Sequence, residues 1–443
     1  MADKPSPRNP LSRLASSLND LRERHQLRHR PTGFGLVLAD RVDYVDPQHW
    51  DTVAAQGGMF LRREVLRVIE EHGPENIQPC YALVFRDHEP VAAVAAQVVS
   101  VTPDSFRNKS AAARPGRSPR LLRRALGPAA RRASAGLRER MLVAGNVLSW
   151  GFHGIAFAQG EDPAQLWPGV AEALYRIRRA HRLSGQTDFV MVKDLTAQQS
   201  GLDALRAFSY RPVQTEPNMV LEIDPAWHSY EDYLAALDAK YRRNAKDQAK
   251  KLAAVACAVE PLTGLSAVAG RLHELYLAVH SNASVRLVTL RESYLPALAR
   301  ALPEDFRCTV IRRADEILGF VTSLRDGDTA IAYYIGFDRE AAGALPLYLR
   351  LLHATIANAI DWGCQRLSLG HTALEPKAAL GAKPEPMSVW LRHRVPALNW
   401  MLRGLLGAVP HAEAPERNPF KKVTTQNAPQ RATEGSGSGE HWS

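Results

Sequence analysis

The chain has 443 residues, of which 45% are hydrophobic, so it can build two or three domains with real cores and is not a disordered protein. Its four cysteines lie far apart, without the CxxC or Cys/His spacing that a disulfide framework or a zinc site needs, so we expect reduced thiols and no metal. No apolar run has the length of a membrane span, and the N-terminus lacks a signal-peptide core. These features predict a cytoplasmic protein, either soluble or peripheral on the inner face of the membrane.

The net charge of +10 is concentrated in one segment. Residues 107–140 hold eleven Lys or Arg and one acid, Glu139, while the rest of the chain is electrically balanced. An isolated basic segment indicates a separable arm, whereas a uniformly basic surface would indicate nucleic-acid binding by the fold itself. Three interpretations stay open: a solvated insertion, a contact with an anionic membrane surface, and a contact with tRNA phosphates.

In chain order, residues 1–40 are predicted to be a peripheral N-terminal segment, and 41–225 a first domain interrupted by the basic insertion. The hydrophobic patterns predict these elements in it: a helix over 62–72, strands over 81–85, 91–101 and 141–148, a helix over 164–181 and a strand over 188–192. A Gly-containing loop, GFHG, lies before the second helix.

The second half repeats this order without the interruption and is predicted to form a second domain over 226–410. The expected elements are strands over 308–311, 317–324 and 329–335, then a helix that ends at Gly363 and a strand over 366–369. Two copies of a hairpin-rich sheet that ends in strand, helix, strand predict tandem α/β domains with mixed α+β sheets.

Three further segments complete the organisation. Residues 228–252 are predicted to be one amphipathic helix between the halves, with a basic face that we interpret as solvated. Residues 393–409 form an apolar, amphipathic stretch too short to cross a bilayer. The tail over 411–443 is predicted to be largely disordered, because it is polar and contains GSGSG.

Polar residues cluster directly after the last predicted strand of the second half. His371, Thr372, Glu375 and Lys377 follow Gly370 within seven residues. Groups that leave the carboxyl end of a strand in an open α/β sheet usually bind ligands. The sequence therefore predicts the active site at this loop.

These segments resemble the GNAT acyltransferase superfamily, specifically its double-domain FemAB-like and BioF2-like acetyltransferase branch. The segments that carry the resemblance are YLAALDAKYRRNAKDQAKKL, YYIGFD followed by LPLYLRLLHATIANAI, LSLGHTALEPKAALGA and the closing RNPFKK. In that superfamily each domain has the order of elements given above. The resemblance implies tandem GNAT domains and acyl-CoA as co-substrate.

The chain departs from the best-known GNAT pattern at the phosphate loop. Single-domain members carry Gln/Arg-x-x-Gly-x-Gly/Ala between the third strand and the helix, where backbone N–H groups hold the pyrophosphate of coenzyme A. Here the stretch is GFDREAAGALP. Gly336, Gly343 and Ala344 leave room for a phosphate, but their spacing differs and Asp338 and Glu340 add negative charge.

Transfer of an acyl group to an amine needs a proton acceptor, an oxyanion donor and an acid for the leaving group. His371 and Glu375 are the available bases, and Thr372 and Lys377 are candidate substrate-binding groups, although Lys377 also fits a surface lysine.

Aromatic and polar residues outside this loop are further candidates. Tyr333 and Tyr334 alternate across a strand, so only one of them is expected to reach a ligand: Tyr334 as the acid, or Tyr333 as a binding residue. His280, Asn282 and Arg286 form a second polar cluster that we expect to face the first across a cleft.

Three functions follow from these residues and the resemblance. The first is an N-acyltransferase that moves an acyl group from acyl-CoA to the amine of a small or lipid-like acceptor, such as a sphingoid base, as in ceramide synthase-like members. The second is an aminoacyl-tRNA-dependent Fem-type transferase acting on a peptidoglycan precursor or small amine. The third is a non-catalytic GNAT-fold binding protein.

Overall fold

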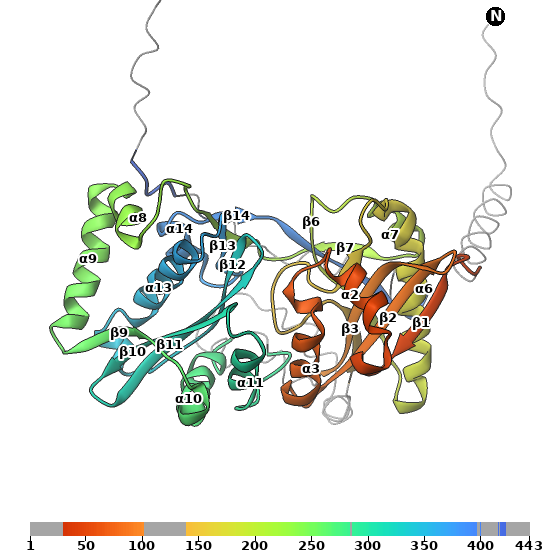
Figure 1. Ribbon diagram of the computed structural model, residues 1–443, viewed down its shortest axis with the longest axis horizontal. Helices are drawn as coiled ribbons and strands as arrows, with labels where there is room; N and C mark the ends of the chain where they lie inside the picture. Colours follow the sequence, from red (N-terminus) through yellow and green to blue (C-terminus); the bar gives the residue numbers. More distant parts are fainter. Residues whose placement is uncertain are drawn as a thin grey trace, which may run out of the picture.

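A computed structural model describes residues 30–101, 139–283, 286–396, 399, 415 and 417–421. The chain forms two mixed β-sheets, each with helices on its faces, which lie side by side (Figure 1). This arrangement confirms the predicted α/β class with two related units.

The described residues of the first half form strands β1 to β8 and helices α2, α3, α6 and α7. The strands are β1 (Gly35–Ala39), β2 (Ile77–Arg86), β3 (Glu89–Val101), β4 (Glu139–Ala144), β5 (Ile155–Phe157), β6 (Phe189–Thr196), β7 (Arg211–Gln214) and β8 (Asn218–Glu222). The helices are α2 (Pro47–Ala54), α3 (Arg63–His72), α6 (Pro163–Ala180) and α7 (Asp203–Ala207), with short 3-10 turns at Val42–Tyr44, Met59–Leu61 and His181–Ser184.

The second half holds strands β9 to β15 and helices α8 to α14. The strands are β9 (Cys257–Pro261), β10 (Phe306–Arg313), β11 (Glu316–Asp326), β12 (Thr329–Phe337), β13 (Arg366–Ser368), β14 (Lys383–Glu385) and β15 (Met387–His393). The helices are α8 (Tyr230–Ala236), α9 (Ala239–Ala253), α10 (Ala269–His280), α11 (Tyr294–Ala301), α12 (Ala341–Ala344), α13 (Leu347–Asp361) and α14 (Leu374–Ala379), with a 3-10 turn at Leu265–Val268.

Each half contains the same run of elements, which confirms the predicted order. In the first half, antiparallel β2, β3 and β4 lead into α6, and β6 returns parallel to β4. In the second half, antiparallel β10, β11 and β12 lead into α13, and β13 returns parallel to β12. A parallel return requires a crossover, and a helix supplies it in both copies.

Local sequence explains the main turns and helix ends. The β2–β3 hairpin turns at Asp87 and His88, both at positive φ (49° and 70°), as a two-residue turn between right-twisted strands requires. Helix α6 begins with Pro163 after Asp162, whose carboxylate accepts a hydrogen bond from the backbone N–H of Ala164.

The two sheets exchange strands near the ends of the halves. The first sheet has the order β1-β2-β3-β4-β6-β15-β7, and the second has the order β14-β8-β13-β12-β11-β10-β9. Thus β8, from the end of the first half, pairs with β13 in the second sheet, and β15 lies between β6 and β7 in the first. The predicted division near residue 225 stays a prediction, but each sheet needs a strand from the other half.

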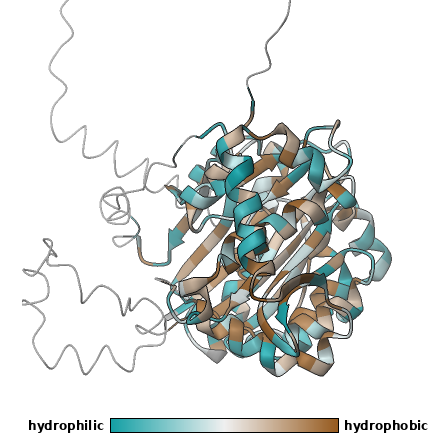
Figure 2. Ribbon diagram, turned by 90° about the vertical axis from the view of Figure 1, so that its left-hand side faces the viewer, coloured by the Kyte–Doolittle hydropathy of each residue, from teal (hydrophilic) through white to brown (hydrophobic). Residues whose placement is uncertain are grey.

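One apolar core runs across both halves. Phe60, Val65 and Ile69 of the first half pack in the same cluster as Tyr294 and Leu298 of α11. At the edge of this contact, Asp305 accepts hydrogen bonds from Arg62 of the first half (2.7 Å) and from Arg325 of β11 (2.8 Å). In Figure 2, apolar residues lie along the strands, while the helix at the front has a hydrophilic outer face.

The single helix predicted over 228–252 is instead two helices, α8 and α9. The chain breaks at Leu237, which forms a β-bridge with Phe420, and the backbone N–H of Asp238 donates to the carbonyl of Pro419. A C-terminal segment therefore takes the backbone groups that would have continued the helix, a tertiary contact that helical periodicity does not reveal.

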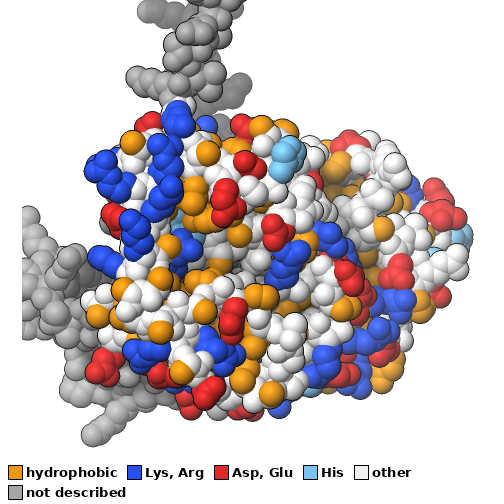
Figure 3. All heavy atoms as spheres, turned by 60° about the vertical axis from the view of Figure 1, so that its left-hand side comes forward, with side chains coloured by type: hydrophobic (Ala, Val, Ile, Leu, Met, Phe, Trp, Pro, Cys, Tyr) orange, Lys and Arg blue, Asp and Glu red, His pale blue; other side chains and the backbone are white. Residues whose placement is uncertain are grey.

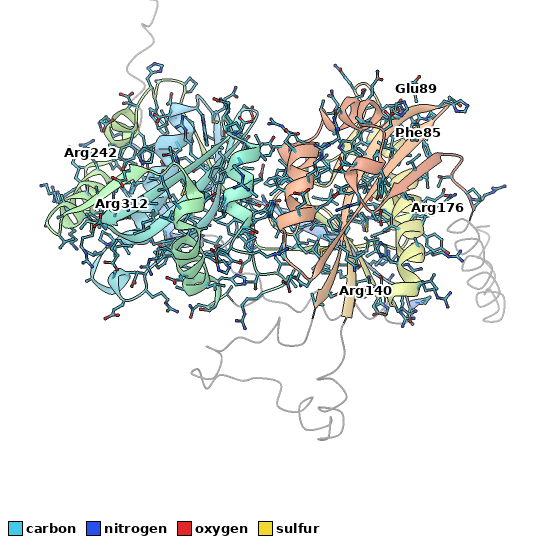
Figure 4. The ribbon with its side chains drawn as sticks, turned by 60° about the horizontal axis from the view of Figure 1, so that its bottom comes forward. Phe85, Glu89, Arg140, Arg176, Arg242 and Arg312 are labelled. Atoms are coloured by element: carbon cyan, nitrogen blue, oxygen red, sulfur yellow. The ribbon has the colours of Figure 1, made fainter. Side chains whose placement is uncertain are left out.

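Most of the basic segment over 107–140 lies outside the described residues, as do residues 1–29 and most of 397–443. Its last two residues begin β4, and Arg140 is buried, where it donates to Gln78 (2.9 Å) and to the carbonyl of Gly185 (3.1 Å) (Figure 4). Arg140 thus belongs to the first sheet rather than to a separable arm. Within the described part of the chain, no helix is long and apolar enough to span a membrane.

Candidate functional site

Strands β12 and β13 separate soon after they begin. They pair only over Thr329 to Ile331 on β12 and Arg366 to Ser368 on β13. Beyond these residues β12 continues to Phe337, while the other strand ends and the chain turns away at Gly370. Parallel strands that part in this way leave their unpaired edges facing one another, at the carboxyl end of β13 where the polar residues follow.

A β-bulge places Tyr333 and Tyr334 on one side of the sheet. The pairing with β11 runs from Ser323 opposite Ala332 directly to Val321 opposite Ile335, so the two tyrosines oppose the single residue Thr322. Both rings join the same apolar cluster, with centroids 4.6 Å apart. The prediction that the tyrosines alternate across the strand is therefore wrong, because the bulge removes the two-residue period.

Both tyrosine hydroxyls are bonded within the protein. Tyr333 shares a hydrogen bond with the hydroxyl of Tyr294 (2.8 Å), and Tyr334 donates to the carbonyl of Leu148 (3.1 Å). Burial raises the pKa of each phenol well above its usual value, so both stay protonated at neutral pH.

The first half sends a loop into this region. Residues 144 and 155 pair with Ala96 and Val94 of β3, while Ala95 between them bonds to both Gly145 (3.1 Å) and Gly154 (2.8 Å). Strands β4 and β5 are thus one strand from which residues 145–154 protrude. We call this protrusion the finger.

The finger is held by its own half and contacts the other. Asp194 lies on β6 beyond the part that pairs with β4, and it accepts from the backbone N–H of Gly151 (2.9 Å). Lys193 pairs with Asp194 and donates to the carbonyl of Ser149 (2.7 Å). At the tip, the indole N–H of Trp150 donates to the hydroxyl of Ser368 on β13 (3.0 Å). The finger therefore forms one wall of the site in the second half.

Gly370 turns the chain beneath Trp150. Its φ is +78°, and a Cβ atom at this position would lie 2.8 Å from the indole ring. Its backbone N–H donates to the side chain of Asn218 (3.0 Å), on the exchanged strand β8. Glycine is thus required both by the backbone conformation and by the approach of the finger.

Lys377 lies in α14 and is buried, with 3% of its surface exposed, so its interpretation as a surface lysine is wrong. Its Nζ donates to the carbonyl of Gly370 (3.2 Å). Burial lowers the pKa of this amine to about 7, against the opposing effect of Glu216. Near neutral pH the amine therefore exchanges its proton readily.

His371 follows Gly370, with its ring edge-on to Trp150 at 6.1 Å between centroids. Its surface is open to solvent, yet its pKa is lowered, first by desolvation and then by the positive charge of Lys193, with a smaller effect from Lys377 and an opposing one from Asp194. The imidazole is neutral at pH 7 and can accept a proton.

The other two polar residues of this segment are exposed. Glu375 forms an ion pair with Arg417, and Thr372 precedes α14. The structure thus directs the Glu375 carboxylate toward the C-terminal segment, where its partner Arg417 is also exposed. Of the two predicted bases, His371 is the one that contacts the finger.

The second predicted cluster connects to the first through aromatic rings. His280 stacks on Tyr276 (5.0 Å), and Tyr276 contacts Tyr334 edge-on (5.6 Å). Tyr333 and Trp150 continue the series to His371. The side-chain amide of Asn282 instead donates to the carbonyl of Ala278 at the exposed end of α10. Burial lowers the pKa of His280, and the positive charge of Arg286 lowers it further.

The connection from β12 to α13 replaces the expected phosphate loop. A Cβ atom on Gly336 would lie 2.6 Å from the backbone nitrogen of Tyr276, so α10 fills the room assigned there to a phosphate, and that prediction is wrong. Gly343 has no neighbouring atom within 4 Å of such a Cβ, and Ala344 ends α12 beside it. Asp338 accepts from the first backbone N–H groups of α12 and lies 3.7 Å from Arg271, which offsets its charge.

Sequence reasoning missed Trp150, Lys193 and Asp194. They lie in the other half of the chain, and only the spacing of glycines around the GFHG motif signals an irregular strand there. Across the described ranges, no group of three or more His, Cys, Asp or Glu side chains is placed to hold a metal ion.

A family model supplies the deciding comparison. Residues 239–377, from the start of α9 to Lys377, match the acetyltransferase (GNAT) domain. The second half of the chain thus contains a GNAT acetyltransferase domain. The matched range covers the separated strands β12 and β13 and ends at the buried lysine. The first GNAT-like domain repeats the same strand order and provides the finger.

Solved structures with a similar arrangement are distant in sequence. FemX is 11% identical, with a TM-score of 0.48 over 82% of this chain and 98% of its own. A tandem GNAT protein from the clavulanic acid biosynthesis pathway is 12% identical, with a TM-score of 0.47 over 82% and 99%. The C-terminal domain of a putative lysylphosphatidylglycerol synthetase from Agrobacterium fabrum is 14% identical, with a TM-score of 0.39 over 62% and 86%. No curated protein matches the sequence.

Proposed function

We propose that this GNAT acyltransferase moves an acyl group from acyl-CoA to the amine of a small or lipid-like acceptor, such as a sphingoid base. The observation that carries the proposal is the pair His371 and Lys377, which lie directly after β13 beside the finger and have lowered pKa values. Groups whose pKa values the surrounding protein lowers, at the end of a strand where ligands bind, are typical of proton transfer.

In the proposed reaction, the acceptor nitrogen attacks the thioester carbonyl carbon, a C–N bond forms and the C–S bond breaks. His371 accepts the proton that the nitrogen loses and returns it to solvent, and the departing thiolate is protonated in turn. The Tyr334 hydroxyl is the proposed acid, since its raised pKa keeps it protonated; its hydrogen bond to Leu148 must then open during turnover. Lys377, when protonated, stabilises the oxyanion.

The β12–α13 connection fits coenzyme A in part. Gly343 and Ala344 are exposed and leave space for a ligand, whereas Gly336 packs against α10. The proposed approach of the donor is therefore past α12 and the start of α13. The acceptor would then come from the side of the tyrosines and the finger, where Tyr333 and His280 line its path.

A second candidate function is aminoacyl-tRNA-dependent transfer of the Fem type. The observation that favours it is the exposed basic surface of α9, which Figure 3 shows at one end of the molecule. We call it the α9 strip; its exposed members are Lys240, Arg243, Lys246, Lys250 and Lys251. Among the described residues none of them forms an ion pair, so they are available to phosphates.

The test incubates the purified protein with a panel of acyl-CoAs and amines, including sphinganine, and detects new amides by mass spectrometry. A His371→Gln variant run in parallel shows whether product depends on the site. Product from an acyl-CoA supports the proposal. Product only from an aminoacyl-tRNA would assign the second function, and no product from any pair would leave a binding protein.

A further inference from the structure

A cavity of about 160 Å³ lies beside the site, on the other side of α14 from the reacting groups. Lys377 of α14 points to Gly370, whereas Pro376, Ala379 and Leu380 line the cavity. The remaining walls come from α8, α9, α13 and the C-terminal segment: Tyr233, Leu237, Lys240, Tyr241, Asn244, Ala245, Gln248, Leu349, His353 and Arg417.

A buried hydrogen-bond acceptor in this cavity has no partner among the described residues. Gln248 is 7% exposed, and its Oε1 has no hydrogen-bond partner, while its Nε2 donates to Asn244 (3.4 Å). An unpaired buried amide oxygen costs free energy, so such a group indicates a ligand that supplies an N–H.

The neighbouring histidine in the lining is uncharged. Arg350 donates to the Tyr230 hydroxyl (3.3 Å), and this hydroxyl lies 2.9 Å from Nδ1 of His353. Burial lowers the pKa of His353 to about 3, so the ring is neutral. The lining therefore combines an acceptor, on Gln248, with a neutral imidazole.

The charge of the lining is positive. Its described residues include Lys240 and Arg417 and no acid, although Arg417 shares its charge with Glu375. Lys240 is exposed at the rim and also belongs to the α9 strip, so the cavity opens onto a basic surface. Two tyrosines, Tyr233 and Tyr241, supply aromatic walls. A flat ring with an amino group, linked to phosphate, matches these features.

We propose that this cavity binds the base of an adenosine phosphate, with its amino group on Gln248 and its phosphate on Lys240. The choice of ligand rests on the proposed function, because the nucleotide would be the distal end of the acyl donor. Two donors share this chemistry: coenzyme A, which ends in a phosphorylated adenosine, and an aminoacyl-tRNA, which ends in adenosine.

The test is isothermal titration calorimetry of the full chain with adenosine 3′,5′-bisphosphate, coenzyme A and a short RNA hairpin that ends in CCA. We expect the nucleotide to bind, with about tenfold weaker binding to Gln248→Leu, as one lost hydrogen bond predicts. Lys240→Ala should weaken binding severalfold at low salt. Lys383→Ala, an exposed lysine on β14 outside both the cavity lining and the α9 strip, is the matched control and should bind as wild type does.

Inosine 3′,5′-bisphosphate tests the amino group itself, because it carries a carbonyl in its place. It should bind wild type more weakly than the adenosine compound, and Gln248→Leu should remove the difference. Thermal melting checks that Gln248→Leu folds. If it does not fold, Lys240→Ala, which changes an exposed residue, remains as the test of the cavity. Binding of coenzyme A but not RNA, or of RNA but not coenzyme A, would support the cavity as a nucleotide site and would show which donor supplies the adenosine.

The proposal is overturned if no probe binds, or if both cavity variants bind as wild type does. These outcomes are separable from the failure of acyl transfer, because calorimetry needs no turnover. Nucleotide binding with the expected variants but without amide product would remove the proposed function and keep the site. Acyl transfer with the same KM for the acyl donor in wild type and in both variants would keep the proposed function and remove the cavity as its nucleotide site.

Discussion

His371 and Lys377 show how burial gives ordinary side chains unusual proton affinities. The two lie six residues apart, yet His371 is exposed and Lys377 is buried. Each has a lowered pKa because the surrounding protein disfavours its charged form. The imidazole is thus neutral at pH 7, and the amine is divided between its two forms.

We expect His371→Gln to lower kcat by about 10²- to 10⁴-fold, the usual contribution of a general base. The fold should remain, because the side chain is exposed and its removal opens no cavity. Steady-state kinetics and thermal melting measure the two effects. His228→Gln, an exposed histidine at the start of α8, is the control. Equal activity in both variants would move the role of base to Glu375, which Glu375→Gln then tests.

The pH dependence of kcat/KM gives a second prediction. The base must be unprotonated, and its folded pKa lies below the usual histidine value, so activity should persist below pH 6.5 and fall as pH drops through that folded pKa. Replacing Lys193 or Lys377 with Met removes a positive charge that lowers this pKa. The acid limb of the profile should therefore move to higher pH in both variants. A limb that moves to lower pH would contradict the assignment.

Sequence order alone placed the polar residues at the end of β13, and the structure retains them there. It could not show that Lys377 is buried, because burial depends on packing of α14 against residues from both halves. Nor could it separate His371 from Glu375, whose difference comes from the finger on one side and Arg417 on the other.

At the scale of elements, one irregularity in each half builds the site. The bulge in β12 turns two tyrosines to the same side, and the finger interrupts the corresponding strand of the first half. Strands are predicted from the regular alternation of apolar and polar residues. A bulge or a protruding loop breaks this alternation, so the sequence pattern did not predict either interruption. The order of strands and helices, which rests on longer apolar patterns, was predicted well.

The glycines between β12 and α13 separate packing from ligand access. Gly336→Ala should destabilise the protein by about 1–3 kcal/mol, since the new methyl group meets the backbone of α10 and the ring of Phe320. Gly343→Ala, which meets nothing within 4 Å, is the matched control for stability. Urea denaturation compares the two. A larger loss of stability in the control would show that the approach of α10 is not what requires glycine.

Trp150 tests whether the first half takes part in the reaction of the second. Trp150→Ala removes the hydrogen bond to Ser368 and the contact with His371, so we expect a loss in kcat/KM of about tenfold or more. Trp150→Phe keeps an aromatic ring and should retain more activity. Trp362→Phe, a tryptophan at the end of α13, controls for the general effect of the substitution. Wild-type kinetics in Trp150→Ala would show that the finger only covers the site.

At the scale of the whole molecule, the exchanged strands make the two halves interdependent. Strand β8 supplies Asn218, which holds both Ser368 and Gly370, while β15 fills the gap between β6 and β7. The tandem repeat was readable from the order of elements. The exchange was not, because β8 and β15 are short strands whose pairing partners are set by tertiary structure.

The exchange and the shared core predict that the protein unfolds as one cooperative unit. Trp390 lies on β15 and packs into the core of the first sheet, so Trp390→Ala should cost about 3–5 kcal/mol. Because β15 continues directly from β14 in the second sheet, both halves should melt together at a lower temperature. Differential scanning calorimetry should then show one transition, with equal calorimetric and van't Hoff enthalpies. Two transitions, with only one shifted by Trp390→Ala, would show that each half folds without the strand it receives.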